Sequence, residues 1–175
     1  MTEKKEKILQ AALELFAQEG FKSTSTSKVA KRAGVSEGLI FRHFENKEGL
    51  LAAIIQEGEE RAKMLFANIV LETEPMEVIR KTFEIAQMMR ISKEAADFWK
   101  LQYKIKWELE QYGEHKMEPL QRALTDAFAK LGYESPHLEG QLLLISLDGL
   151  ATRFYLQDDF DIDPVIKLLK SKYGI

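Results

Sequence analysis

The sequence predicts an all-α protein of about nine helices, and three observations lead to this fold class. Apolar residues recur at intervals of three and four along most of the chain, which is the spacing of one face of a helix. No segment alternates apolar and polar residues over the length of a strand, and no Asn-Gly or Asp-Gly turn joins two apolar runs. Only 4 Pro and 10 Gly interrupt the 175 residues, mostly where a helix should begin or end.

The first four helices are expected to be one amphipathic helix, two short helices and one long helix. Gly20 follows the first helix as its terminator, and the hydroxyl run at 23–27 offers an N-cap for the second. Gly34 breaks the second helix, after which Ser36 can cap the third, and Asn46 can cap the fourth. The expected spans are 3–18, 27–33, 37–43 and 47–70.

Five longer helices are expected in the rest of the chain. Ser92 is a candidate N-cap for the second of these five. Ser135-Pro136 and Asp163-Pro164 each combine a cap with a proline at the first helical position, so they mark the starts of the fourth and fifth. The expected spans are 76–90, 93–112, 116–131, 135–157 and 162–173.

The composition narrows the class of protein. With 45% hydrophobic and 30% charged residues the chain is an ordinary globular one, and without Cys it has no disulfide, thiolate zinc site or cysteine nucleophile. The charged N-terminus is no signal peptide, and no run of about 18 apolar residues could span a bilayer. No motif for a metal, a cofactor or catalysis occurs. We therefore expect a cytoplasmic protein that is not an enzyme and has no membrane partner.

The net charge of −3 conceals a basic segment. Residues 22–47 carry six Lys and Arg against two Glu, a local balance of +4. The two short helices around Gly34 have the lengths and the turn of a helix-turn-helix, whose second helix enters the major groove of DNA. Hydroxyls at a helix start, and Asn46-Lys47 at the start of the long helix, are suited to phosphate groups. A DNA-binding domain is expected over 1–46, and a ligand-binding and dimerisation domain over 47–175, with the long helix connecting the two.

A set of residues in the N-terminal third agrees in order, spacing and type with a known family. These residues are Ile8, Ala12, Phe16, Gly20-Phe21, Thr24-Ser25-Thr26, Val29-Ala30, Ala33-Gly34-Val35-Ser36, Gly38, Phe41, Phe44, Lys47-Glu48 and Leu50. On them, segment 8–54 resembles the N-terminal domain of the TetR family of bacterial transcriptional regulators. The resemblance covers about a quarter of the chain without a gap. It implies a helix-turn-helix that binds a palindromic operator in double-stranded DNA.

The local charge and the resemblance together predict which residues contact DNA. Those expected at phosphate groups are Ser25, Thr26, His43 and Lys47, and the further ones are Lys28, Ser36, Glu37, Gly38, Leu39, Phe41 and Arg42. Glu37, near the base edges by the resemblance, could accept from cytosine N4 or simply favour the helix N-terminus. Two residues depart from the family pattern. Phe41 replaces the usual Tyr and lacks its hydroxyl, whereas Leu39 replaces a small polar residue and favours apolar contact with a thymine methyl.

The C-terminal part carries candidate ligand-binding residues. Trp99, Tyr103 and Trp107 recur every four residues and share one stripe of a helix. Such a stripe is either a core seam or one wall of a pocket, and for any single residue the core seam is the more common case. The resemblance, which implies a ligand in the central bundle, favours a pocket for the group without selecting its members. Glu108 and Asp148 are carboxylates that could orient the ligand. The candidate residues for an apolar or amphipathic effector are Phe66, Phe83, Met88, Trp99, Tyr103, Trp107 and Phe154.

The last two helices carry apolar stripes suited to an interface. In TetR-like proteins these helices pair with their copies in a four-helix bundle, so the resemblance implies a twofold homodimer. Such a dimer also suits two half-sites about 34–36 Å apart. The candidate interface residues are Leu142, Ile145, Gly149, Thr152, Leu156, Val165, Leu168 and Leu169. The acidic run at 158–163 is interpreted as a solvated loop, because it lacks the Gly and distal Glu of a calcium loop.

The leading hypothesis is therefore a ligand-released repressor that binds its operator as a dimer. An activator would differ only in where the operator lies relative to a promoter, and the residues do not distinguish the two. The contrasting hypothesis is an all-helical carrier or sensor of an apolar small molecule that does not bind DNA. Charge placement discriminates them, because a DNA-binding protein must present its Lys and Arg side chains on one face and a carrier need not.

Overall fold

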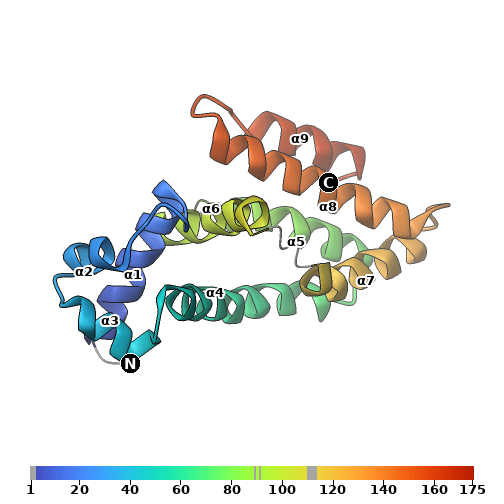
Figure 1. The fold of residues 1–175 in the computed structure, drawn as a ribbon. Coiled ribbons are helices and arrows are strands. Elements are labelled where there is room, and N and C mark those ends of the chain that lie inside the picture. Colours follow the sequence, from blue (N-terminus) through green and yellow to red (C-terminus); the bar gives the residue numbers. More distant parts are fainter. Residues whose placement is uncertain (1–2, 89, 91, 110–113) are drawn as a thin grey trace. The chain divides into compact units, whose positions relative to one another are not determined.

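The computed structural model describes residues 3–175 apart from 89, 91 and 110–113, and these described residues form nine α-helices and no strand (Figure 1). The helices are α1 (Glu3–Glu19), α2 (Thr26–Ala33), α3 (Glu37–Phe44), α4 (Lys47–Val70), α5 (Pro75–Met88), α6 (Lys93–Glu108), α7 (Glu114–Lys130), α8 (Pro136–Leu156) and α9 (Asp163–Lys172). The all-α fold class is confirmed. Within the same described residues, no helix is both long and apolar enough to cross a membrane.

Helix boundaries agree closely with those expected from the sequence, with two exceptions. The expected helix 76–90 ends as α5 at Met88, and residue 89 lies outside the described residues. The expected helix 93–112 ends as α6 at Glu108, where the amide of Leu109 still donates to the carbonyl of Ile105. The remainder of that expected helix falls largely on residues outside the described ones.

Side-chain caps explain several of the helix starts. The hydroxyl of Ser25 accepts from the backbone amide of Lys28, and the hydroxyl of Ser92 accepts from the backbone amide of Ala95. The side-chain oxygen of Asn46 accepts from Gly49 N at 2.7 Å. Ser36 and Ser135 also occupy N-cap positions, but their hydroxyls make no capping hydrogen bond. The first of these two therefore keeps its hydroxyl available at the start of α3.

The chain divides into two compact units, each with its own core. The first unit contains residues 1–63 and 90–112, so α6 packs together with α1 to α3 and the first part of α4. Fully buried side chains from all of these elements meet in one cluster, among them Ile8, Phe16, Val29, Ile40, Leu50 and Leu101. The sequence suggests a boundary between two domains at residue 46. The compact units differ from these two domains, because α6 packs with the N-terminal helices.

The second unit contains residues 64–89 and 113–175, and α5, α7, α8 and α9 form its core. Its largest fully buried side chains include Ile79, Phe83, Leu120, Leu124, Phe128 and Leu143. The ring of Phe128 contacts those of Tyr133 and Tyr173 with centroid separations of 4.9 and 5.4 Å. These aromatic contacts join α7 to the C-terminal end of α9.

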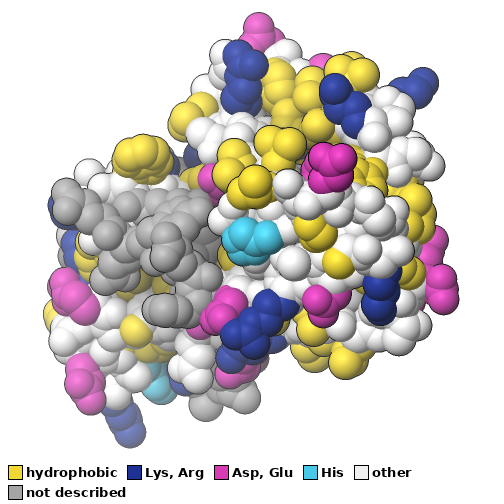
Figure 2. All heavy atoms as spheres, turned by 90° about the vertical axis from the view of Figure 1, so that its right-hand side faces the viewer, with side chains coloured by type: hydrophobic (Ala, Val, Ile, Leu, Met, Phe, Trp, Pro, Cys, Tyr) yellow, Lys and Arg dark blue, Asp and Glu magenta, His cyan; other side chains and the backbone are white. Residues whose placement is uncertain are grey.

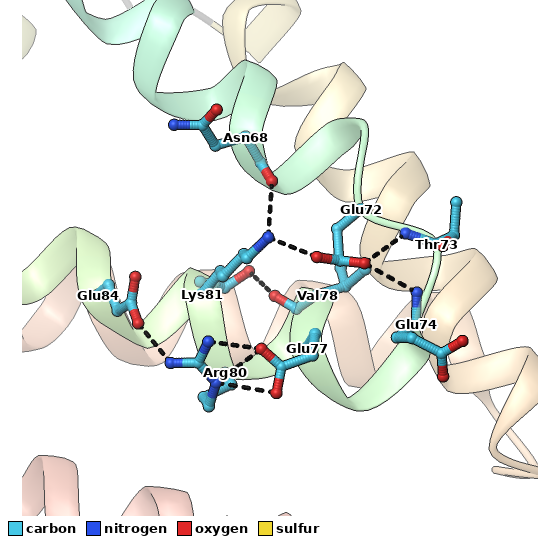
Figure 3. A network of polar contacts seen from close by, with 10 residues as sticks. Asn68, Glu72, Thr73, Glu74, Glu77, Val78, Arg80, Lys81 and Glu84 are labelled. Atoms are coloured by element: carbon cyan, nitrogen blue, oxygen red, sulfur yellow. Dashed lines mark hydrogen bonds and ion pairs between the residues drawn. The ribbon is translucent and has the colours of Figure 1, made fainter.

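A local polar network surrounds the α4–α5 turn, residues 71–74, within the second unit (Figure 3). The carboxylate of Glu72 accepts from the amides of Thr73 at 2.8 Å and Glu74 at 3.1 Å, and it forms an ion pair with Lys81. The ammonium of Lys81 also donates to the carbonyl of Asn68. The hydrogen bonds from Lys81 and the two amides lower the pKa of Glu72 to about 2, since they stabilise its charged form.

Candidate nucleic-acid interface

Helices α2 and α3 form a helix-turn-helix around Gly34. Gly34 has φ +68°, the left-handed conformation that a residue without Cβ adopts at little cost, and its amide donates to the carbonyl of Lys31. The amide of Val35 donates to the carbonyl of Ala30 at 3.0 Å, which closes the end of α2. Val29 on α2 and Ile40 on α3 are fully buried, so both helices are anchored in the core of the first unit.

The residues expected to contact DNA differ in exposure. Those that are exposed are Ser25, Lys28, Ser36, Gly38, Phe41 and Arg42, and those that are partly buried are Thr26, Glu37, Leu39, His43 and Lys47. Phe41 is notable, because it is a large apolar residue of α3, the second helix of the helix-turn-helix, and 44% of it is exposed. Leu39, by contrast, packs partly against the core of the first unit. The roles of these residues toward DNA stay predictions.

Two of the expected DNA contacts bind each other. Thr26 is the first residue of α2, and Glu37 is the first residue of α3. The hydroxyl of Thr26 donates to Oε1 of Glu37 at 2.6 Å. The structure thus brings together a residue expected at phosphate and one expected near the bases.

Lys47, at the start of α4, directs its ammonium toward the α1–α2 turn, residues 20–25. Its Nζ donates to the carbonyl of Phe21 at 3.0 Å and to that of Thr24 at 3.1 Å. The same ammonium lies 4.4 Å from the centroid of the Phe21 ring, within the range of a cation–π contact. Much of its hydrogen-bonding capacity is therefore directed at protein, and its contact with phosphate stays a prediction.

The basic residues of segment 22–47 divide into paired and unpaired ones. Lys28 forms an ion pair with Glu19 at 2.6 Å, and Arg32 forms one with Glu14 at 2.7 Å. The hydrogen bond from Arg32, with one from Gln10, lowers the pKa of Glu14. The other four, Lys22, Lys31, Arg42 and Lys47, form no ion pair with any described residue. Whereas the ammonium of Lys47 binds backbone carbonyls, the side chains of Lys22, Lys31 and Arg42 are exposed. These three are the cations most available to phosphate groups.

Helix α6 forms hydrogen bonds with the α1–α2 turn that were not predicted from the sequence. The carboxylate of Glu108, interpreted from the sequence as a candidate ligand-orienting group, accepts from the amides of Phe21 at 3.0 Å and Lys22 at 3.2 Å. One helical turn earlier, the ammonium of Lys104 donates to the carbonyl of Gln18 at 2.8 Å. No local pattern could reveal these contacts, because each joins residues more than eighty positions apart.

The candidate ligand-binding residues are distributed over both units. In the second unit Phe83 is fully buried, while Phe66 and Phe154 are partly buried. In the first unit Trp99 and Tyr103 are partly buried, and Trp107 is 83% exposed. The side chain of Met88 lies outside the described residues. A pocket formed by this set stays a prediction.

The candidate interface residues on α8 and α9 are largely exposed. The exposed fractions are 55% for Leu142, 68% for Ile145, 77% for Leu156 and 58% for Leu168, and Gly149 is exposed as well. Thr152, Val165 and Leu169 are partly buried. Figure 2 shows one face of the molecule, on which hydrophobic side chains reach the surface between scattered charged ones. Large exposed aliphatic side chains on adjacent helices are typical of an interface that a second chain covers.

This chain is similar to known proteins in two ways. Its N-terminal segment is similar to them in sequence, and nearly the whole chain is similar to them in fold. Residues 8–54 match the family described as bacterial regulatory proteins, tetR family. The HTH-type transcriptional regulator YvkB of Bacillus subtilis, itself uncharacterised, is 42% identical over 60 residues, which are 34% of this chain and 32% of that protein. This chain thus matches about a third of the length of that curated relative.

Two solved structures share the fold over nearly the whole chain. A Saccharomonospora viridis protein in complex with choline has a TM-score of 0.80 at 17% identity, with 98% of this chain and 95% of that chain covered. NalD, the secondary repressor of a multidrug efflux pump in Pseudomonas aeruginosa, has a TM-score of 0.70 at 19% identity, with 97% and 93% covered. At these identities the likeness establishes the fold.

Proposed function

We propose that this chain, whose residues 8–54 match the tetR family of bacterial regulatory proteins, is a sequence-specific DNA-binding transcriptional regulator. The helix-turn-helix of α2 and α3 carries the proposal. Gly34 forms its turn, Val29 and Ile40 anchor its helices, and Phe41 and Arg42 are exposed on the second helix. That second helix is the element that enters a major groove.

The regulator binds its operator as a twofold homodimer. The exposed aliphatic side chains of α8 and α9, such as Ile145 and Leu156, supply an apolar surface for a second copy of the chain. Two copies present two recognition helices, which requires half-sites about 34–36 Å apart in a palindromic operator. Lys22, Lys31 and Arg42 are the cations that contact phosphate groups first, because no carboxylate of the described structure pairs with them.

We propose that the regulator acts as a repressor and that an apolar or amphipathic effector releases it from DNA. Helix α6, which carries the candidate ligand-binding residues Trp99 and Tyr103, belongs to the helix-turn-helix unit, because Leu101 lies in the core of that unit and Glu108 binds the α1–α2 turn. An effector that binds one placement of α6 more tightly than another shifts the population that fits DNA. The name of NalD describes it as a repressor, which is consistent with this role.

Duplex selection tests the proposal directly. The purified chain is equilibrated with random duplexes, bound ones are sequenced, and affinity for the selected duplex is measured over a range of salt concentrations. We expect a palindromic consensus and a logarithmic salt slope that grows by about 0.9 for each phosphate contact. Arg42→Ala should reduce the slope by about one such step.

Lys130→Ala is the matched control. It removes one exposed cation from the second unit, which has no helix-turn-helix, and should leave the slope unchanged. If the native chain binds no duplex in a salt-dependent way, the proposal is wrong, and a carrier of a small molecule that does not bind DNA becomes the better description.

A further inference from the structure

We infer that Thr26 is a positioning residue that orients the carboxylate of Glu37 for base recognition, so that each operator half-site has a cytosine facing the start of α3. The inference deepens the proposed function and rests on it. It follows from the 2.6 Å hydrogen bond between the first residue of α2 and the first residue of α3.

The chemistry of the two groups determines the direction of this hydrogen bond. An ionised carboxylate accepts and cannot donate, so the single hydrogen of the Thr26 hydroxyl points at Glu37. Phosphate oxygens are likewise acceptors at neutral pH. With its only hydrogen engaged, the hydroxyl of Thr26 has nothing to donate to a phosphate group. The family resemblance assigns Thr26 to phosphate, whereas the structure assigns it to Glu37.

The carboxylate of Glu37 keeps most of its acceptor capacity. It forms no ion pair with a described residue, and a carboxylate has about four lone-pair sites, of which Thr26 uses one. It lies in the first turn of α3, at the positive end of the helix dipole. Next along the helix, Gly38 has no side chain, and a Cβ built there would meet nothing within 4 Å. The first turn of the recognition helix thus presents a negative acceptor beside open space.

Such an acceptor discriminates among bases in the major groove. Cytosine presents its N4 amino group as a donor there, and acidic side chains accept from it. Guanine presents O6 and N7, both acceptors, which repel a carboxylate. Thymine presents O4 and a methyl group, neither of which donates. Adenine presents an N6 amino donor, but the N7 acceptor beside it repels a carboxylate. A carboxylate oriented by Thr26 therefore favours cytosine over the other three bases at one position.

Duplex selection with four proteins tests this inference: native, Thr26→Val, Thr26→Ser and Glu37→Gln. Val has nearly the shape of Thr without the hydroxyl, and Ser keeps the hydroxyl. We expect the native protein to prefer cytosine over guanine about tenfold at one position of each half-site. Thr26→Val and Glu37→Gln should reduce that preference to below about threefold, while Thr26→Ser should retain it. Circular dichroism melting of each variant confirms that it is folded.

Three outcomes would overturn the inference. If Thr26 contacts phosphate, Thr26→Val weakens binding to all sequences alike and leaves the base preference of the protein intact. If the hydrogen bond only connects α2 to α3, Thr26→Val lowers the melting temperature without changing the base preference. If Glu37→Gln leaves the base preference intact, the carboxylate does not recognise a base. A native protein that binds no duplex would instead contradict the proposed function itself.

Discussion

Two turns in this molecule use the same chemistry over very different sequence separations. At both the α1–α2 turn and the α4–α5 turn, a lysine ammonium donates to a backbone carbonyl and a glutamate carboxylate accepts from two successive backbone amides. At the α4–α5 turn, both side chains lie within 13 residues of their partners. At the α1–α2 turn, the ammonium comes from Lys47, more than twenty residues away, and the carboxylate from Glu108, 86 and 87 residues away.

The α4–α5 turn is therefore autonomous, which means that nearby residues stabilise it, whereas the α1–α2 turn requires a helix that lies far away in the sequence. The α4–α5 turn carries its own polar groups, so its conformation depends on little beyond α4 and α5. The α1–α2 turn depends on where α6 lies, because Glu108 is the last residue of that helix. The start of α2, where Ser25 is expected at a phosphate group, is therefore coupled to α6 through two backbone amides.

Among the substitutions that test this difference between the two turns, Gly20→Ala should lower the free energy of unfolding the most. Gly20 has φ +94°, and a Cβ there would lie 2.3 Å from Oε1 of Glu108. Alanine would strain the backbone and displace the carboxylate from the amides of Phe21 and Lys22. We expect the free energy of unfolding, measured by urea titration, to fall by about 2–3 kcal/mol. Gly132→Ala is the control, since Gly132 has φ +81° and nothing within 4 Å, and it should cost about 1 kcal/mol. Equal losses would contradict the role given to Glu108.

Lys47→Met should have the next largest effect. Methionine keeps an aliphatic side chain but removes the ammonium that binds the carbonyls of Phe21 and Thr24. Hydrogen bonds to charged groups contribute about 1.5–3 kcal/mol, so we expect a loss of about 2 kcal/mol in the same titration. Lys81→Met in the autonomous turn is the matched variant, and it should cost less than about 1 kcal/mol. The reverse order would mean that the local turn contributes more to stability than the long-range one.

Asp97→Asn should stabilise the protein, and with it the packing of α6 within the first unit. Asp97 is 9% exposed, its Oδ2 has no hydrogen-bond partner in the described structure, and burial raises its pKa. A raised pKa in the folded state means that stability is lost as pH rises through that pKa, because the buried carboxylate must ionise. Asparagine avoids this loss, so we expect about 1 kcal/mol of added stability at pH 7.

The advantage of Asp97→Asn should shrink as pH falls and disappear below about pH 3, where the native carboxyl is protonated in the folded and the unfolded state. Urea titrations of both proteins at pH 7 and below about pH 3 check this dependence. A gain that is the same at both pH values would show that ionisation of the buried carboxylate is not its cause.

Glu72→Gln should have the smallest effect, and that effect should depend on pH. Because the pKa of Glu72 is lowered from 4.5 to about 2, its contribution to stability is full above 4.5 and is lost as pH falls toward 2. We expect a slightly lower thermal midpoint for the variant at pH 7 and a difference from the native protein that shrinks with acidification. Glu74→Gln, which removes an exposed carboxylate from the same turn, should show no such convergence.

Local features of the sequence predicted most of the fold and the position of the candidate interface. The glycine that ends α2 and the hydroxyl that caps it both act over four residues or fewer, so they can be recognised without knowing the rest of the chain. Packing of α6 with the N-terminal helices was not predicted. Its buried side chains, Leu101 and Ile105, have the same helical spacing whether they face one core or another.

The sequence by itself determined where helices begin and end and which pair forms the helix-turn-helix, because periodicity, caps and left-handed glycines are properties of neighbouring residues. Tertiary structure alone decided how the polar side chains are used. It directed the hydroxyl of Thr26 to Glu37, the ammonium of Lys47 to a turn, and the carboxylate of Glu108 to two amides. A polar group binds whichever partner packing brings within about 3 Å, and that partner can lie anywhere in the chain.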